Sequence, residues 1–301
     1  TMTHEDRTAL VALPLVVAVG ALLAAAGSQG GAVAGGIPVF ALAVALAFLV
    51  QWAVFVPSYL ARTERFFDLT GGLTYIGVTL LALALTPGLD ARALILAAMV
   101  VVWAARLGTF LFRRISRAGK DDRFDALKSS PLRFLNVWTV QGLWVSFTAA
   151  AAWVGITSAT RAPLDGFALA GLAVWALGFG VEVVADLQKS RFNAQPANKG
   201  RFISTGLWSR SRHPNYLGEI VVWIGVALIA LPALRGWQWV ALVSPVFVTL
   251  LLTRVSGVPL LEKKADARWG GQPDYEAYKR DTPALIPRLG RRDGGAQGRR
   301  P

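Results

Sequence analysis

The stretch RHPNYLGEIVVWIGVALIA, residues 212–230, begins with polar side chains and continues as an apolar run. Its first part holds Arg212, His213, Asn215 and Glu219, whereas the residues after Glu219 carry no charge. Pro214 suits the first turn of a helix, because a backbone N–H would have no helical partner there. The stretch therefore predicts an apolar helix whose start carries a group of polar side chains.

The composition of the whole chain indicates a membrane protein. Of 301 residues, 54% are hydrophobic and only 16% are charged. A bilayer core needs about 20 mostly apolar residues for each helix. Eight such stretches occur, at about 8–26, 38–59, 72–86, 91–112, 134–157, 165–186, 215–232 and 236–253. We predict an all-α polytopic integral membrane protein with about eight transmembrane helices, the third of which is short and flanked by glycines.

The distribution of Lys and Arg explains the net charge of +13 without nucleic acid as a partner. Segments 113–133, 187–214 and 254–301 hold seven, six and eleven of these residues, and they fall on one side of the membrane if there are eight spans. This is the positive-inside pattern, which predicts cytoplasmic N- and C-termini. We expect a bacterial inner membrane protein. The first apolar run has an acidic start and no clear cleavage site, so we interpret it as a retained helix.

We expect a single transmembrane helical domain over residues 1–287, followed by a basic flexible tail over 288–301 with membrane lipids as its contacts. Nothing indicates an obligate protein partner. The chain has no cysteine, which excludes disulfides and thiolate metal ligands. It has two histidines, so we expect no metal site.

Two ionisable residues stand out in the first half of the chain. Arg106 interrupts an apolar span, where a charged residue is energetically costly. It therefore either has a function or extends its side chain so that the guanidinium reaches the lipid headgroups. Asp68 lies in FFDLTGGLTY, residues 66–75, which we interpret as a turn before the third span. A carboxyl group in an apolar environment has a raised pKa, so it can stay protonated near neutral pH and serve as a general acid. Alternatively, Asp68 caps a helix or pairs with Arg65.

Two pairs with helical spacing stand out in the second half. Glu182 and Asp186 are four residues apart at the end of the sixth span, where they pair with cations of the next loop or accept hydrogen bonds from a ligand. Asn215 and Glu219 share one face of the seventh helix. Its start suits a phosphate. The arginines placed to hold that phosphate are Arg201, Arg210 and Arg212. Alternatively, these residues form a helix cap and a lipid-facing basic surface.

With these residues in view, the chain resembles a family of bacterial membrane proteins related to steroid 5α-reductases. The resemblance is strongest over residues 180–287, in GVEVVADLQKSRF, in KGRFISTGLWSRSRHPNYLGEIVVWIG and in YEAYKRDTPALIPRL. A weaker resemblance covers FFDLTGGLTY and WAARLGTFLFRRI. The string RHPxYxG also occurs in membrane methyltransferases that act on isoprenylcysteine or phospholipids.

The resemblance implies NADPH as cofactor and hydride transfer to a carbon–carbon double bond conjugated to a carbonyl. The substrate would be a lipophilic small molecule, lipid or steroid-like, that enters from the bilayer. By this resemblance, Asp186 matches an aspartate that binds the cofactor, and Arg201 and Arg254 match arginines on its phosphates. Asn215 and Glu219 match an Asn and a Glu beside the nicotinamide end. The full predicted cofactor set adds Lys189, Arg191, Asn193, Arg212, His213, Tyr216, Glu262 and Tyr278.

Asp68 lies near the position of the family's catalytic glutamate. The catalytic tyrosine of the animal enzymes aligns with Trp103, so we expect Tyr75 to supply the second hydroxyl group. Arg106 completes the predicted catalytic set.

Two other functions stay open at this point. The first is a membrane methyltransferase that uses S-adenosylmethionine, and the second is a non-catalytic lipid-binding membrane protein. S-adenosylmethionine carries no phosphate, so the arginines around residues 201–212 favour a dinucleotide.

Overall fold

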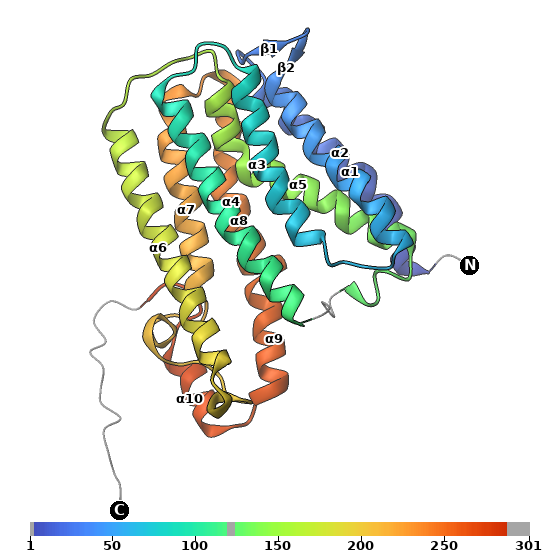
Figure 1. Cartoon of the computed structure of the whole chain (residues 1–301), viewed down its shortest axis with the longest axis vertical. Coiled ribbons are helices and arrows are strands. Elements are labelled where there is room, and N and C mark those ends of the chain that lie inside the picture. The colour runs from blue at the N-terminus through green and yellow to red at the C-terminus, as the bar shows by residue number, and fades with distance from the viewer. Residues whose placement is uncertain (1–2, 119–123, 288–301) are drawn as a thin grey trace, which may run out of the picture. The chain divides into compact units, whose positions relative to one another are not determined.

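The computed structural model describes residues 3–118 and 124–287, and in these ranges the fold is almost entirely helical (Figure 1). Eight helical stretches are long and apolar enough to cross a membrane, which confirms the all-α polytopic fold. The helices are α1 (His4–Gly27), α2 (Val39–Leu60), α3 (Phe67–Leu85), α4 (Ala91–Ala118), α5 (Pro131–Thr157), α6 (Gly166–Ala194), α7 (Pro214–Ala230), α8 (Val243–Leu250), α9 (Val258–Trp269) and α10 (Pro273–Asp281).

The eighth predicted span is not one regular α-helix. A 3₁₀ stretch, Gly236–Leu242, leads into α8, and a π-helical turn, Leu251–Val255, separates α8 from α9. Further short 3₁₀ turns, Pro196–Asn198, Gly206–Ser209 and Leu231–Ala233, lie in the connections on either side of α7.

Two predicted boundaries were wrong. The segment FFDLTGG is not a turn, because α3 already begins at Phe67 and includes both glycines. A methyl group on Gly71 would lie 2.7 Å from Nε2 of Gln141, and one on Gly72 would lie 3.3 Å from Cα of Gly108. These glycines therefore allow close packing against α5 and α4. Likewise, α6 does not end near Asp186 but continues to Ala194.

The segment between the first two predicted spans contains the two strands of the described residues. Val33–Ala34 (β1) pairs antiparallel with Ile37–Pro38 (β2). Gly35 and Gly36 join them with φ values of 56° and 82°. Two consecutive positive φ values are the requirement of the hairpin turn that matches strand twist, and glycine meets it without strain.

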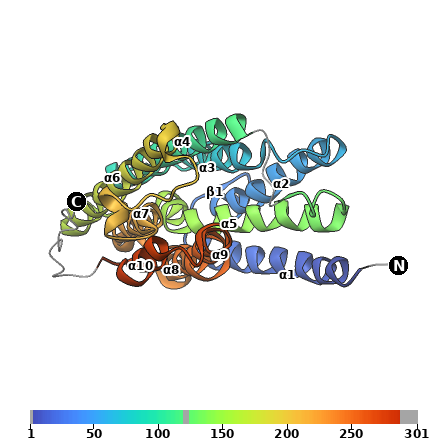
Figure 2. The ribbon, with the colours of Figure 1, turned by 90° about the horizontal axis from the view of Figure 1, so that it is seen from below.

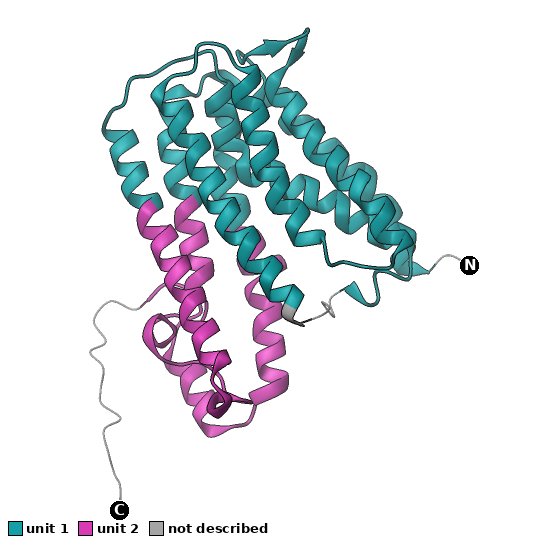
Figure 3. Ribbon diagram, viewed as in Figure 1, with its two compact units in different colours: residues 1–175, 223–248 teal, residues 176–222, 249–301 magenta. Residues whose placement is uncertain are grey.

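The chain forms two compact units (Figure 3). Unit 1 comprises 1–175 and 223–248, and unit 2 comprises 176–222 and 249–301. In unit 1, α5 lies between α1 on one side and α3 and α4 on the other (Figure 2). It is the most buried of the spans. The single domain over 1–287 stays a prediction, and the tail 288–301 lies outside the described residues.

Glycines let α6 and α7 approach each other closely within each unit. In unit 1, a methyl group on Gly171 would lie 2.7 Å from the carbonyl oxygen of Gly225. In unit 2, one on Gly178 would lie 2.6 Å from the backbone nitrogen of Val222 and 2.7 Å from the carbonyl oxygen of Gly218. Small residues at such crossings are typical of membrane helix packing.

Candidate functional site

The first feature of unit 2 is a contact between the predicted residues Asp186 and Asn215. Nδ2 of Asn215 donates a hydrogen bond of 3.2 Å to Oδ1 of Asp186. Asp186 is buried, with 5% of its surface exposed, and Glu182, one turn earlier, is 2% exposed. Oδ1 of Asn215 is also buried and has no hydrogen-bond partner within 3–118 and 124–287. A buried acceptor without a partner is uncommon in a folded protein, and this oxygen is able to accept a hydrogen from a ligand.

Gly218 of the RHPNYLGE string explains why these short side chains meet. A methyl group at Gly218 would lie 2.6 Å from the backbone nitrogen of Glu182 and 2.7 Å from the carbonyl oxygen of Gly178. The backbones of α6 and α7 are therefore in contact beside the two carboxylates. The sequence motif contains a packing glycine as well as polar residues.

The GLW string, residues 206–208, anchors the loop after α6 to that helix. The indole nitrogen of Trp208 donates to the carbonyl oxygen of Ala185 over 3.0 Å. The backbone nitrogen of Leu207 donates to Oε1 of Gln188 over 2.9 Å. Gly206 has a φ of 62°, which favours glycine, and a methyl group on it would lie 2.6 Å from the side-chain amide of Gln188, which would have to move. Nζ of Lys189 lies 4.5 Å from the centre of the Trp208 ring.

His213 and Arg212 both contact Glu262 of α9. Nε2 of His213 lies 2.7 Å from Oε1 of Glu262. The guanidinium of Arg212 donates to the same carboxylate over 3.0 and 3.2 Å. Residues at the start of α7 are thus bound to a helix about 50 positions later in the sequence.

Arg212 also holds the segment after α10. Its guanidinium donates to the carbonyl oxygens of Lys279, over 2.7 Å, and of Thr282. Its backbone nitrogen donates to the carbonyl oxygen of Pro283 over 2.9 Å. The structure therefore gives Arg212 a connecting role, and a phosphate contact for this residue stays a prediction.

Tyr278 lies in the same cluster. Its hydroxyl donates to the carbonyl oxygen of Trp208 over 2.7 Å, and its ring stacks on Phe202 at 5.3 Å. Burial raises the pKa of the Tyr278 hydroxyl, so it stays a protonated donor at neutral pH. Tyr278 thus connects α10 to the loop that GLW anchors.

The other predicted cofactor residues of unit 2 differ in exposure. Glu219 and Tyr216 are half-buried in α7, and Lys189 is half-buried near the end of α6. Four are exposed: Arg191, Asn193, Arg201 and Arg254. Arg254 lies in the π-helical turn before α9. An exposed cation keeps its charge available to a ligand phosphate.

The predicted catalytic residues lie in unit 1. Asp68 is half-buried in the first turn of α3, and Tyr75 is buried two turns further along the same face of the helix. The Tyr75 ring meets Trp103 edge-on at 5.2 Å. Trp223 meets Trp103 edge-on at 4.9 Å. The hydroxyl-bearing ring of Tyr75 thus lies beside Trp103, for which a match to the catalytic tyrosine of the animal reductases stays a prediction.

Arg106 is half-buried in α4, and its guanidinium lies 5.5 Å from the centre of the Phe110 ring. This contact with an aromatic face is a cation–π interaction. A catalytic role for Arg106 stays a prediction.

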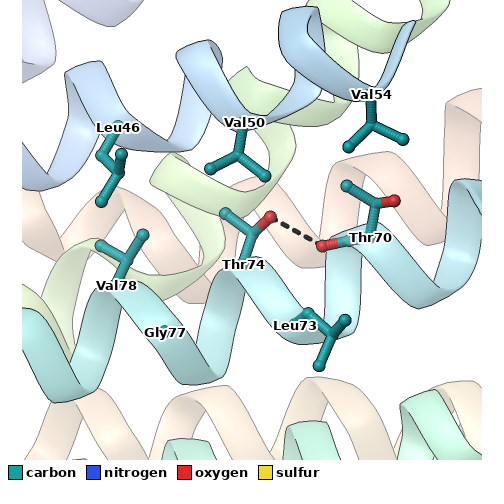
Figure 4. A pocket seen from close by; sticks show the side chains of 8 residues that line it. All are labelled: Leu46, Val50, Val54, Thr70, Leu73, Thr74, Gly77 and Val78. Carbon is teal, nitrogen blue, oxygen red and sulfur yellow. Dashed lines mark hydrogen bonds between the residues drawn. The ribbon is translucent and has the colours of Figure 1, made fainter. Parts of the chain in front are cut away.

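A shallow cavity of about 190 Å³ lies between α2 and α3 (Figure 4). Its lining is almost wholly apolar, and Thr74 in it donates to the carbonyl oxygen of Thr70 over 2.7 Å. Helical spacing puts Thr70, Leu73, Thr74 and Gly77 on one face of α3 and Asp68 and Tyr75 on the opposite face. This cavity is therefore not the site of the predicted catalytic pair.

The helices define the class of the protein, and comparison with known proteins gives its family. The eight apolar helices define a multi-pass integral membrane protein. Residues 54–282 match the family described as "Protein of unknown function (DUF1295)", and the chain belongs to this family. The match includes every predicted site residue.

A curated relative is an uncharacterized protein of Schizosaccharomyces pombe. It is 25% identical over 228 residues, which cover 66% of this chain and 64% of that protein. The chain thus spans about 64% of the length of this relative. No solved structure matches the chain.

Proposed function

We propose that the protein is a membrane-embedded, NADPH-dependent reductase of a carbon–carbon double bond conjugated to a carbonyl group in a lipid or steroid-like substrate. The main support is the hydrogen bond between Asp186 and Asn215. The resemblance assigns both residues to the cofactor, and the fold brings them together although 29 positions separate them. The family also includes steroid 5α-reductase-like proteins.

The residues of unit 2 fit the chemical groups of NADPH. The buried, unpartnered Oδ1 of Asn215 is suited to a hydroxyl or amide hydrogen of the cofactor. Lys189, Arg191 and Arg201 are half-buried or exposed cations within one short segment, and they would hold phosphates. When bound, NADPH supplies the hydride. The site would be loaded from the cytoplasm if the predicted orientation of the chain holds.

Asp68 and Tyr75 would act on the carbonyl group of the substrate. Addition of a hydride to the β-carbon moves negative charge onto the carbonyl oxygen, and a donor aimed at that oxygen stabilises the transition state. The buried Tyr75 hydroxyl and the Asp68 carboxyl group, which share a face of α3, would be these donors. The position of Tyr75 beside Trp103 supports its role as a replacement for the family's tyrosine.

One observation favours a methyltransferase that uses S-adenosylmethionine as the second candidate. Arg212, which we expected to hold a phosphate, is bound to Glu262 and to two backbone carbonyls. Fewer cations then remain at the start of α7, and S-adenosylmethionine needs none for a phosphate. The two candidates therefore differ in the cofactor, and the methyltransferase needs no acid at Asp68.

The direct test is to identify the small molecule that the full chain binds. The protein would be purified in detergent, examined by mass spectrometry for retained molecules, and titrated with NADPH while nicotinamide fluorescence is recorded. We expect saturable NADPH binding that Asp186→Ala weakens. Binding of S-adenosylmethionine without NADPH would establish the methyltransferase instead. Binding of neither, with lipids retained, would leave the non-catalytic lipid-binding protein.

A further inference from the structure

At the start of α7, the side chains of His213 and Asn215 each donate a hydrogen bond to a carboxylate. Asn215 donates its Nδ2 hydrogen to Asp186, and Nε2 of His213 faces Oε1 of Glu262 at 2.7 Å. A carboxylate only accepts hydrogen bonds, so the hydrogen between His213 and Glu262 lies on Nε2. Both side chains are thus fixed in orientation by an acid of another helix.

The other polar atom of each side chain has no protein donor. Nδ1 of His213 and Oδ1 of Asn215 are both buried and without a hydrogen-bond partner in the part of the chain that the structure describes. His213 as a whole is only 5% exposed. Arg212 also pairs with Glu262, and a hydrogen on Nδ1 would be a buried donor without an acceptor among the described residues. In the neutral ring Nδ1 is an acceptor.

The ring of His213 is held on several sides. It stacks on Tyr216 with the ring centres 5.8 Å apart and an interplanar angle of 13°. Its backbone nitrogen donates to the carbonyl oxygen of Ala284 over 3.0 Å. The direction of Nδ1 is therefore set by the fold before any ligand arrives, which reduces the entropy lost on binding.

We infer that the start of α7 binds an uncharged, hydrogen-donating part of the ligand through His213 Nδ1 and Asn215 Oδ1, with Glu262 as the positioning residue of His213. Two acceptors suit amide or hydroxyl hydrogens and offer nothing to a phosphate, whose oxygens also accept at neutral pH. If the proposed function holds, this part is the carboxamide or a ribose hydroxyl of NADPH. The phosphates then bind elsewhere, at cations such as Lys189, Arg191 and Arg201. The resemblance also implies Asn215 beside the nicotinamide end of the cofactor, so the new element is His213 Nδ1 as a second acceptor. The residues alone had instead suggested a phosphate at the start of the helix.

Two substitutions of His213 separate the acceptor from the bond to Glu262. In His213→Gln, the longer amide can still donate to Glu262 from the place of Nε2, but the acceptor at Nδ1 is lost. In His213→Asn, the shorter amide can place an oxygen near Nδ1, but it no longer reaches Glu262. A purely structural histidine therefore tolerates Gln better than Asn in every measurement.

The first experiment measures the affinity of the full chain in detergent for NADPH by calorimetry, together with Tm. We expect His213→Gln to weaken NADPH binding about fivefold to tenfold, the effect of one hydrogen bond, with Tm close to wild type. We expect His213→Asn to lower Tm. Unchanged affinity in His213→Gln would overturn the ligand contact, and an unchanged Tm in His213→Asn would overturn the role of Glu262.

A second measurement needs no ligand. The chain has two histidines, so the variant His4→Gln leaves His213 as the source of every histidine signal in ¹⁵N NMR. We expect a protonated Nε2 and an unprotonated Nδ1 at neutral pH, and loss of this preference in Glu262→Ala. The opposite tautomer would overturn the inference. If wild-type protein does not bind NADPH, the proposed function fails, while the tautomer still decides whether Glu262 positions His213.

Discussion

Asn215 of α7 donates a hydrogen bond to the buried carboxylate of Asp186 of α6 over 3.2 Å. Both side chains are short, so the contact requires that the two helix backbones lie close together. Gly178 and Gly218 meet this condition one to two turns away, where even a methyl group would collide with backbone atoms. The hydrogen bond between Asp186 and Asn215 therefore depends on the close crossing of α6 and α7 at the glycines. A substitution at either place should affect the other.

Replacing Asn215 with Asp tests the polar pair itself. Asn215→Asp exchanges the donating amide for a second carboxyl group beside Asp186, so the hydrogen bond is lost and two acids face each other. We expect a loss of stability of about 1–3 kcal/mol, seen as a lower Tm, and weaker NADPH binding. Gln272→Glu makes the same chemical change at an exposed position and should leave both quantities near wild type. An Asn215→Asp protein with wild-type Tm and affinity would contradict the role of this contact.

A methyl group tests the close approach of the helices. In Gly178→Ala the new Cβ would lie 2.6 Å from the backbone nitrogen of Val222, so α6 and α7 must separate. We expect a loss of about 1–3 kcal/mol, typical of overpacking, measured by thermal unfolding in detergent. Gly180 of the same helix has open space around it, and Gly180→Ala should be neutral or slightly stabilising. Equal effects of the two substitutions would show that the crossing is not tightly packed.

The sequence predicts the class of fold because apolar stretches of membrane length are independent of tertiary contacts. Boundaries were less predictable. The helix α6 continues through Lys189 and Arg191 because no proline or glycine interrupts it before Pro196, yet its apolar run ends earlier. The glycines Gly71 and Gly72 looked like a turn, whereas they are contact points for Gln141 and Gly108. Their meaning depends on neighbours that are distant in the sequence.

The sequence predicted which residues belong to the candidate site, but it did not predict which of them contact one another. Helical spacing and resemblance pointed to Asp186 and Asn215, but their mutual contact depends on the crossing at Gly218. The pairing of Arg212 with Glu262 joins residues 50 positions apart, and no local pattern indicates it. Trp208 and Gln188 were missed as anchors of the loop. The signal for them is Gly206, because a glycine two residues before a tryptophan in a polar loop suggests a required turn.

Arg92, which is not one of the predicted site residues, shows the same limit. It is 1% exposed and donates to the carbonyl oxygens of Ile229, over 2.7 Å, and Pro163, over 2.6 Å, and to Asp165. Arg92→Met would leave these carbonyls without donors, and we expect it to cost about 2–4 kcal/mol in unfolding experiments. Asp165→Asn should cost much less, because Arg92 keeps the carbonyls. A mild effect of Arg92→Met would contradict this structural role.

The same pair gives a pH dependence. The hydrogen bond from Arg92 holds the pKa of Asp165 below its ordinary value. A lowered carboxyl pKa stabilises the folded state above the ordinary value, about pH 4, and this contribution is lost as the pH falls through the lowered pKa. The acid dependence of Tm in this range should therefore be smaller in Asp165→Asn than in wild type.

Asp68→Asn separates chemistry from cofactor binding. Asp68 lies in unit 1, in the first turn of α3, whereas the residues expected to hold NADPH lie in unit 2. We expect Asp68→Asn to keep the affinity for NADPH and to slow its oxidation in the presence of a lipid α,β-unsaturated ketone about 100-fold or more, as loss of a charge-stabilising donor does. Normal turnover by this variant would rule out Asp68 as the acid.

A rescue experiment tests whether Tyr75 replaces the family's catalytic tyrosine. The rings of Tyr75 and Trp103 are in edge-on contact, with their centres 5.2 Å apart. A hydroxyl group on the side chain of residue 103 would therefore lie close to the place of the Tyr75 hydroxyl. We expect Tyr75→Phe to lower the rate of ketone-dependent NADPH oxidation on the order of 100-fold. Adding Trp103→Tyr should restore part of the rate, whereas Trp103→Phe, which creates the same space without a hydroxyl, should not. A wild-type rate in Tyr75→Phe would rule out its hydroxyl as the donor, and equal rates for the two double variants would show that a hydroxyl on residue 103 does not replace it.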